Sequence, residues 1–305
     1  MPMRRYRSFA ADSARWAGFE HRDGDVVVDT PGKCGTTWMQ MCCLVIVHQT
    51  PTLPTRLPEI SPWVDTVLGP PGRTHQLLAA QTHRRVMKTH TPLDGFPLDD
   101  RVTYVCVARD PRDVLFSKND HQANTNREAV QAARVEGLGA EQAAARTRPP
   151  VPTDAVAQFW EWVENDNEFE SSNDSLRAVL HHVDTFWGHR HASNVELFHY
   201  SDLLRDLDGQ MRRLARVLGV EADENVWREL VAATDFEAMK NNADQLNPGL
   251  TANHWLDPKR FFSKGGTGRW RGVIDEADMP RYEGRVRGLV PTELAAWVHH
   301  GWLGT

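Results

Sequence analysis

A lysine held between two glycines is the first feature of the sequence that could do chemistry. The stretch "DVVVDTPGKCGTTW" places Lys33 between Gly32 and Gly35, where a short β-branched run gives way to a helical pattern. A turn that leads into a helix N-terminus presents unpaired backbone N–H groups and a partial positive charge, so it suits an anion. The side chain of Lys33 adds a mobile positive charge, and the following threonine hydroxyls add hydrogen-bond donors. This stretch predicts a site for a phosphate-like group.

Three other polar residues end short apolar runs of the kind that form buried strands. His90 ends "RRVMKTH", Arg109 follows "RVTYVCVA", and Tyr200 ends "NVELFHY". Helical patterns lie around these runs, at residues 113–121, 153–169, 175–190, 202–220 and 223–234. Alternating strands and helices predict an α/β fold, with a central parallel sheet flanked by helices on both faces. Ligands of such sheets bind at the carboxyl ends of the strands, so the three residues should meet the glycine-lysine turn at one edge.

The turn and two further segments resemble the signatures of an enzyme family. "TPGKCGTTW" is similar to "YPKSGTTW" of the cytosolic-type sulfotransferases, "RDPRDVLFSK" to their "RNPKDVxVS" motif, and "KTHTPLDGFP" to their "KTHLP" segment. These enzymes move a sulfuryl group from 3'-phosphoadenosine 5'-phosphosulfate (PAPS) to an acceptor hydroxyl or amine, and release the nucleotide product PAP. The resemblance spans residues 19–271. It implies a single domain over residues 1–305, with a P-loop-like strand, loop and helix at the phosphosulfate site.

The resemblance also implies which residues hold the donor nucleotide. The turn from Lys33 to Trp38 would bind the 5'-phosphosulfate, and Arg109 with Ser117 would bind the 3'-phosphate. "HYSDLLRD", "ATDFEAMKNN" and "FFSKGGTGRW" match weaker family patterns that contact the adenine and the 3'-phosphate. The expected nucleotide-binding residues are Lys33, Cys34, Gly35, Thr36, Thr37, Trp38, Arg109, Ser117, Tyr200, Thr234, Phe236, Met239, Phe262, Ser263, Lys264 and Gly265.

Three positions depart from the family pattern. Ser263 stands where the family has an arginine, so one charge-assisted bond is missing, and Arg260 or Arg269 is a candidate to replace it. Asp110 stands where the family usually has an asparagine. Cys34 stands at the position of a family serine, whose backbone N–H does the binding. The helix N-terminus could lower the pKa of the Cys34 thiol, although a role as nucleophile is not expected.

The expected catalytic residues are His90, Lys33 and Lys88. His90 matches the general base of the family, and an imidazole with a pKa near the working pH suits that role. Lys88 lies two residues earlier, on the same face of an extended strand, where it would contact the transferring group. The acceptor would attack the sulfur in line while the two lysines stabilise negative charge, and no metal would be required. The next candidates for the base are His121, His254 and Asp94.

Two other functions stay open at this stage. A metal-dependent P-loop phosphotransferase normally carries GxxxxGK followed by Ser or Thr, whereas the lysine here precedes the second glycine. It would also need an acidic partner on a strand, and Asp29 is the best one available. A non-catalytic nucleotide-binding protein is the other alternative, because Ser263 weakens the expected 3'-phosphate pocket. Magnesium dependence would identify the first alternative, and a lack of PAPS turnover with any acceptor would identify the second.

The composition limits which classes of protein are expected, but it does not identify the acceptor. With 25% charged residues and a formal net charge of -6, the 305-residue chain is expected neither to be disordered nor to bind nucleic acid. No signal sequence or membrane span is evident, and the four cysteines lack zinc-site spacing, so a cytoplasmic protein without a metal site is expected. The acceptor is expected to be a small molecule. A homodimer is possible but unsupported, because the family's dimerisation pattern is missing.

Two further features concern the acceptor side. The insertion at about residues 122–153 either caps the acceptor site as helices or forms a solvated surface segment. Several aromatic residues could line an apolar pocket, although such residues more often lie in a core. They are Phe96, Phe159, Trp160, Trp187 and Trp255. Residues 285–303 predict a pair of packing helices near the end of the chain.

Overall fold

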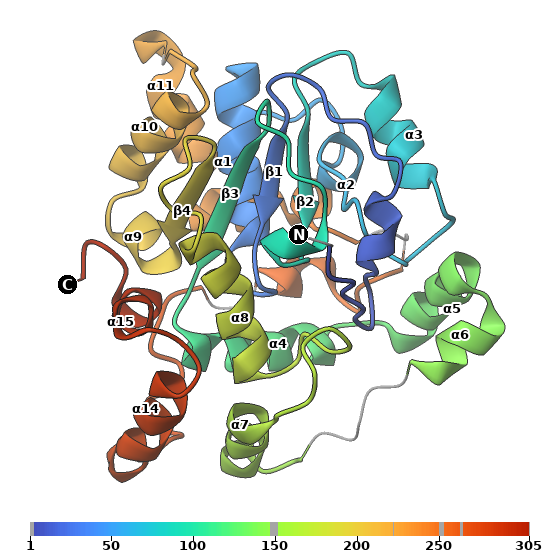
Figure 1. Cartoon of the computed structure of the whole chain (residues 1–305). Coiled ribbons are helices and arrows are strands. Elements are labelled where there is room, and N and C mark those ends of the chain that lie inside the picture. Colours follow the sequence, from blue (N-terminus) through green and yellow to red (C-terminus); the bar gives the residue numbers. More distant parts are fainter. Residues whose placement is uncertain (1–2, 147–151, 222, 250–252, 263–264, 305) are drawn as a thin grey trace.

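The computed structural model of the chain describes residues 3–146, 152–221, 223–249, 253–262 and 265–304. Its centre is a parallel four-stranded sheet with the order β2-β1-β3-β4 (Figure 1). The strands are β1 (Val26–Asp29), β2 (Val86–Thr89), β3 (Thr103–Ala108) and β4 (Val195–His199). The predicted parallel α/β fold is confirmed, and each of the four apolar runs forms a strand.

Helices cover both faces of this sheet. The α-helices are α1 (Thr36–His48), α2 (Leu57–Ile60), α3 (Arg73–Ala80), α4 (Pro111–Ala123), α5 (Arg127–Leu138), α6 (Ala140–Ala145), α7 (Ala155–Glu164), α8 (Leu176–Trp187), α9 (Tyr200–Arg205), α10 (Leu207–Val217), α11 (Glu224–Ala233), α12 (Phe236–Asn241), α13 (Ala243–Leu246), α14 (Met279–Arg287) and α15 (Thr292–His300). Short 3-10 helices occupy Ser13–Trp16, Leu93–Gly95, Pro258–Phe261 and Glu276–Asp278.

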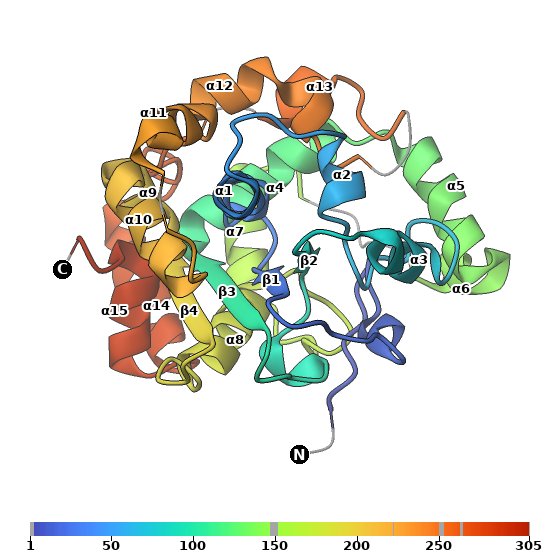
Figure 2. The same cartoon turned by 90° about the horizontal axis from the view of Figure 1, so that it is seen from above.

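The alternation of side chains along each strand builds two cores, one on each face of the sheet. Figure 2 shows α1 and α8 on opposite sides of the strands. Val26 and Val28 belong to the core that contains the apolar side chains of α1, on one face of the sheet. Val27, which points the other way, belongs to the core that contains those of α8 and α15. Both faces are apolar because helices cover both, as the near-continuous valine run of β1 predicts.

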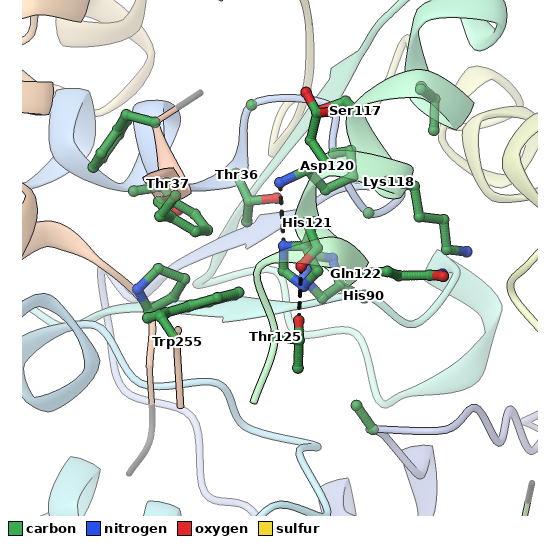
Figure 3. Close-up of a pocket in the computed structure, with 18 of the residues that line it drawn as sticks. Thr36, Thr37, His90, Ser117, Lys118, Asp120, His121, Gln122, Thr125 and Trp255 are labelled. Carbon is green, nitrogen blue, oxygen red and sulfur yellow. Dashed lines mark hydrogen bonds between the residues drawn. The ribbon is translucent and has the colours of Figure 1, made fainter. Parts of the chain in front are cut away.

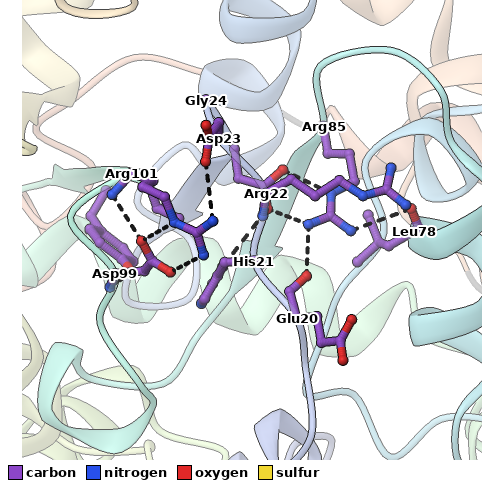
Figure 4. A network of polar contacts seen from close by, with 12 residues as sticks. Glu20, His21, Arg22, Asp23, Gly24, Leu78, Arg85, Asp99 and Arg101 are labelled. Carbon is purple, nitrogen blue, oxygen red and sulfur yellow. Dashed lines mark hydrogen bonds and ion pairs between the residues drawn. The ribbon is translucent and has the colours of Figure 1, made fainter.

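Charged side chains at the amino ends of the strands pair with one another (Figure 4). Arg85, just before β2, donates from Nε to Asp25, just before β1, at 2.8 Å, and both side chains are almost fully buried. Arg101, before β3, pairs with Asp99 at 2.7 Å and with Asp23 at 3.1 Å on the surface. These cations therefore have carboxylate partners within the chain.

Three other segments can be compared with their sequence patterns. The helical pattern at residues 202–220 is divided into α9 and α10, because the Asp206 carboxylate caps α10 by accepting from the Gly209 N–H at 2.9 Å. The insertion contains α5 and α6. Of the two helices expected within residues 285–303, α15 lies inside that range, whereas α14 begins earlier, at Met279, and ends at Arg287. Within the described ranges, no helix has both the length and the apolar character needed to cross a membrane.

Candidate active site

The turn after β1 has the backbone conformation of an anion-binding loop. Lys33 has a φ of 73° and Gly35 a φ of 102°, so both lie in the left-handed region. At Gly35 an added Cβ would also lie 3.0 Å from the ring of Tyr200. Glycine is therefore favoured there both by the left-handed backbone and by the lack of room for a side chain. Gly35 caps α1, and the first residue of that helix, Thr36, shares a 2.5 Å hydrogen bond with the hydroxyl of Thr30. The expected strand, loop and helix are all present.

A cavity of about 890 Å³ lies at the carboxyl edge of the sheet (Figure 3). It brings together most of the residues that the sequence singled out. The expected site residues that line it are Lys33, Gly35, Thr36, Thr37, Trp38, Lys88, His90, Arg109, Ser117, Tyr200, Phe236, Met239, Phe262 and Gly265. Arg260 and Arg269, the candidates to replace the missing arginine, also line it.

Two of the expected residues that the structure describes, Cys34 and Thr234, are not in this lining. The hydroxyl of the fully buried Thr234 donates to the Val231 carbonyl at 2.8 Å, so its side chain faces the core. Cys34 is fully buried, and its N–H donates to the Pro31 carbonyl at 3.3 Å within the turn. Burial raises the pKa of the Cys34 thiol to about 12, the opposite of the lowering considered from the sequence. Ser263 and Lys264 fall outside the described residues.

Three cations converge where β1, β2 and β3 end. Burial, followed by the charges of Arg109 and Lys88, lowers the pKa of Lys33 to about 8. Burial likewise lowers the pKa of Lys88 to about 8. The Arg109 guanidinium donates to the carbonyls of Lys33 at 3.1 Å and Gly266 at 2.9 Å, and its Nε has no partner among the described residues. Among the described residues lining the cavity, the only carboxylate is Asp120, so this edge is strongly cationic.

Backbone and ring contacts fix the orientation of His90. Its Nδ1 lies 2.7 Å from the Thr30 carbonyl, which can only accept, so Nδ1 carries the proton and Nε2 is the basic nitrogen. The indole of Trp63 meets the imidazole edge-on at 5.0 Å and also lies 4.9 Å from the Lys88 ammonium. Burial and the Lys88 charge lower the pKa of His90 to about 3. The sequence-based expectation of a pKa near the working pH did not include this neighbouring cation.

Helix α4 contributes residues that the sequence motifs did not assign to the nucleotide site. His121, one turn after Ser117, places its Nδ1 3.3 Å from the Lys33 ammonium (Figure 3). Asp120 pairs with Arg269 at 2.8 Å, which holds the Arg269 loop against the helix. Asp120 and His121 lie three and four residues after Ser117, so helical periodicity could have indicated that they share its face of α4.

An apolar wall lies beside His90. Phe9, Ala10, Trp63, Leu68 and Val130 form one hydrophobic cluster with Ala133, and these first five also line the cavity. Of the aromatic residues considered for an acceptor pocket, Trp255 lines the cavity, at 4.8 Å from the His121 ring. The other four are Phe96, Phe159, Trp160 and Trp187, and they are buried in the hydrophobic core.

Asp29, the acidic residue that a phosphotransferase would use, does not line the cavity. Its carboxylate is completely buried and lies 3.0 Å from Nε2 of His182, and burial raises its pKa to about 6. Within the described part of the chain, no group of three or more His, Cys, Asp or Glu side chains is arranged to hold a metal ion.

Residues 23–286 match the family model described as the sulfotransferase domain. The chain belongs to the sulfotransferase family. This sulfotransferase is 38% identical to the glycolipid sulfotransferase of Mycobacterium tuberculosis, over 97% of this chain and 94% of that relative. It is 25% identical to Sulfotransferase 2B1 of Homo sapiens, over 88% of this chain and 67% of that protein. The resemblance noted in the motifs is therefore confirmed across most of the chain, and the enzyme class with it.

Solved structures share the fold. Retinol dehydratase in a complex with retinol and PAP is 24% identical, with a TM-score of 0.69 over 92% of this chain and 85% of that one. Mouse sulfotransferase SULT7A1 complexed with PAP is 16% identical, with a TM-score of 0.63 over 93% and 90% of the two chains. The four-stranded parallel sheet and its flanking helices are thus the sulfotransferase fold.

Proposed function

We propose that this sulfotransferase moves a sulfuryl group from PAPS to a hydroxyl group of a glycolipid, with His90 as the general base. The observation that carries the proposal is the convergence of Lys33, Lys88 and Arg109 around His90 in one cavity. Cations beside a neutral imidazole suit a reaction in which an anion is held while a neutral hydroxyl loses its proton.

The donor would lie along the carboxyl edge of the sheet. The turn from Lys33 and the N-terminus of α1 would receive the phosphosulfate, because N–H groups and positive charge gather there. Arg109 would bind the 3'-phosphate with Ser117, since both line the same cavity and the guanidinium Nε lacks a partner among the described residues. Gly265, with a φ of 60°, would let the backbone approach the same phosphate.

The adenine would lie among aromatic and apolar side chains on the other side of the turn. Trp38 is held in place there, because its indole N–H donates to the Thr234 carbonyl at 2.8 Å and its ring meets Tyr200 edge-on at 5.4 Å. Thr234 would thus act through its carbonyl rather than its side chain. The side chains proposed to contact the base are Trp38, Tyr200, Phe236, Met239 and Phe262.

In the transfer step, Nε2 of His90 would accept the proton of the acceptor hydroxyl. The hydroxyl oxygen forms a bond to sulfur, and the bond between sulfur and the phosphate oxygen breaks, with its electron pair leaving on PAP. Lys88 would stabilise the sulfuryl oxygens, and Lys33 the charge that develops on the leaving phosphate. The negative charge of the donor raises the pKa of His90 above its value beside Lys88 alone, which makes the imidazole a stronger base.

The acceptor site would be amphiphilic. An apolar wall that includes Phe9, Leu68 and Val130 adjoins His90, while polar side chains such as Gln122 and Arg127 line the same cavity. Since Val130 belongs to α5, part of the insertion at residues 122–153 would contact the acceptor. A glycolipid offers both characters, and the relative at 38% identity is named a glycolipid sulfotransferase. A cytoplasmic location is included in the proposal, because all four cysteines are unpaired and buried.

The full chain incubated with PAPS and a bacterial glycolipid extract, with and without EDTA, tests this function. Mass spectrometry should find a sulfated glycolipid and an equal amount of PAP, and EDTA should change neither. Loss of transfer with EDTA, together with phosphate transfer from ATP, would favour a phosphotransferase. PAP binding without turnover on glycolipids, phenols or sterols would favour a non-catalytic nucleotide-binding protein.

A further inference from the structure

A second cavity, of about 660 Å³, adjoins the first and has a different chemistry. It lies between α4, α7 and the connection at residues 165–174, and the start of the chain closes one side. Six of the residues that line it also line the first cavity. These are Ser8, Phe9, Lys118, Gln122, Trp162 and Asn173. A molecule that reaches His90 can therefore extend into the second cavity.

Helix α4 separates the two cavities by its periodicity. Ser117 and His121, four residues apart, face the first cavity, whereas Leu115 and Asn119, also four apart, face the second. Lys118 and Gln122, which lie between those two rows, line both. Figure 3 shows Lys118 and Gln122 on the side of the site away from Thr37. Gln122 is thus placed where the two cavities meet.

The charges around the second cavity are balanced. Its described lining includes three basic and three acidic side chains, whereas the first cavity has seven basic side chains and one acidic one. Lys118 and Asp174, which both line this cavity, form an ion pair at 2.6 Å. An anion would gain little here, and the polar lining disfavours a hydrocarbon chain. The ligand that fits is neutral and rich in hydrogen-bonding groups.

Six of the described side chains that line the second cavity are amides. They are Asn119, Gln122, Gln158, Asn165, Asn167 and Asn173. Asn119 and Gln158 form a reciprocal pair between α4 and α7, in which each amide nitrogen donates to the other amide oxygen, at 2.9 and 2.8 Å. Among the described residues, one N–H and one lone pair of each amide have no partner, and the pair holds them in fixed directions. Trp162, in the same lining, adds an aromatic surface.

We propose that this second cavity binds a neutral saccharide unit of the acceptor, next to the unit that reaches His90. This inference rests on the proposed function, since it assigns a place to the sugar of a glycolipid acceptor. Sugar hydroxyls both donate and accept hydrogen bonds, as side-chain amides do, and the C–H face of a sugar ring can pack on an indole. The apolar wall at Phe9, Leu68 and Val130 is left for the lipid.

Two acceptors that differ by one sugar test the inference with the full chain and PAPS. The probes are octyl glucoside and octyl maltoside, and the variant is Asn119→Leu/Gln158→Leu, which keeps side-chain volume while it removes the amide pair. We expect the ratio of KM for the maltoside to KM for the glucoside to rise about tenfold, the size of one or two lost hydrogen bonds. Gln76→Leu, the same kind of change on exposed α3 and outside both cavities, should leave the ratio as in the wild type.

Asn173→Ala, on an exposed residue of the 165–174 connection, provides a second variant if the first fails to fold, and the ratio should rise about threefold. Saturation-transfer NMR with maltose and PAP gives a readout without turnover. Maltose signals are expected for the wild type and not for Asn119→Leu/Gln158→Leu. An unchanged ratio in both variants, or no maltose signal in the wild type, would overturn the saccharide site. If no alcohol, phenol or glycoside is sulfated, the proposed function itself fails.

Discussion

The two edges of the central sheet differ in how their charged side chains are paired. At the amino edge, Arg85 and Asp25 form a buried pair, and Arg101 pairs with Asp99 (Figure 4). At the carboxyl edge, Lys33 and Lys88 have no carboxylate partner within salt-bridge distance among the described residues. Their hydrogen-bond and ring contacts include the His121 imidazole with Lys33 and the Trp63 indole with Lys88.

This difference separates structural charges from functional ones. Burial acts to raise the pKa of Asp25, but contacts with His21 and Arg85 hold it below its usual value. The carboxylate therefore stays ionised and paired. At the other edge, burial lowers the pKa of both lysines to about 8, and at Lys33 the like charges of Arg109 and Lys88 add to this effect. An anionic ligand would reduce the free-energy cost of burying the protonated lysines. The carboxyl edge is therefore less stable without a ligand than with one.

Replacing the proposed base should give the largest effect. His90→Ala is expected to lower kcat by about 10² to 10⁴, because positioned proton transfer is lost, while affinity for PAP stays within a few fold of wild type. Steady-state kinetics with PAPS and calorimetry with PAP measure the two quantities. His191→Ala, at an exposed imidazole outside both cavities, serves as the control. Near wild-type turnover in His90→Ala would show that His90 is not the base. The next candidates would be His121 and His254, which line the same cavity.

Matched substitutions on the two edges should affect stability differently. Arg85→Met leaves the Asp25 carboxylate buried without its main partner, so we expect a loss of about 3 to 5 kcal/mol of unfolding free energy. Lys88→Met removes a buried cation that has no carboxylate partner in the part of the chain that the structure describes, and its unfolding free energy should stay within about 1 kcal/mol of wild type. Urea denaturation measures both. Equal destabilisation by the two variants would remove the proposed distinction between the edges.

The arginines of the 258–271 segment should give the smallest effect. If Arg260 and Arg269 replace the family arginine that is absent at Ser263, then Arg260→Ala and Arg269→Ala should each weaken PAP binding by about tenfold. Arg271→Ala changes an arginine of the same loop that does not line the cavity, and it should bind PAP as the wild type does. Wild-type affinity in both of the first two variants would show that the missing arginine is not replaced.

Local patterns of the sequence were sufficient for the sheet and for the anion-binding turn. The run before Lys33 is apolar on both faces because both are covered, and Gly35 follows from the left-handed conformation of the turn. The strand pattern placed His90 and Arg109 at the same edge, and the resemblance to family motifs assigned roles to them. These features depend on neighbours in sequence, or on the rule that parallel strands end at one edge.

Features set by packing between distant segments could not be predicted in the same way. Thr234 was expected to contact the nucleotide, but its hydroxyl bonds within its own helix end and its carbonyl holds Trp38. The pKa of His90 is lowered chiefly by burial, which depends on how other segments pack around it, and the nearby Lys88 charge lowers it further. The second cavity forms only where α4 meets α7, so neither sequence segment indicates it alone.

Proton uptake on PAP binding is the most direct test of the central claim that the carboxyl-edge lysines face an anionic nucleotide. Each lysine has a pKa of about 8, so each is half protonated at pH 8, and binding should raise both pKa values. Calorimetry at pH 8 in buffers of different ionisation enthalpy should therefore show uptake of about one proton per PAP bound. Lys33→Met should reduce this to about half a proton. PAP binding with no proton uptake would contradict the claim.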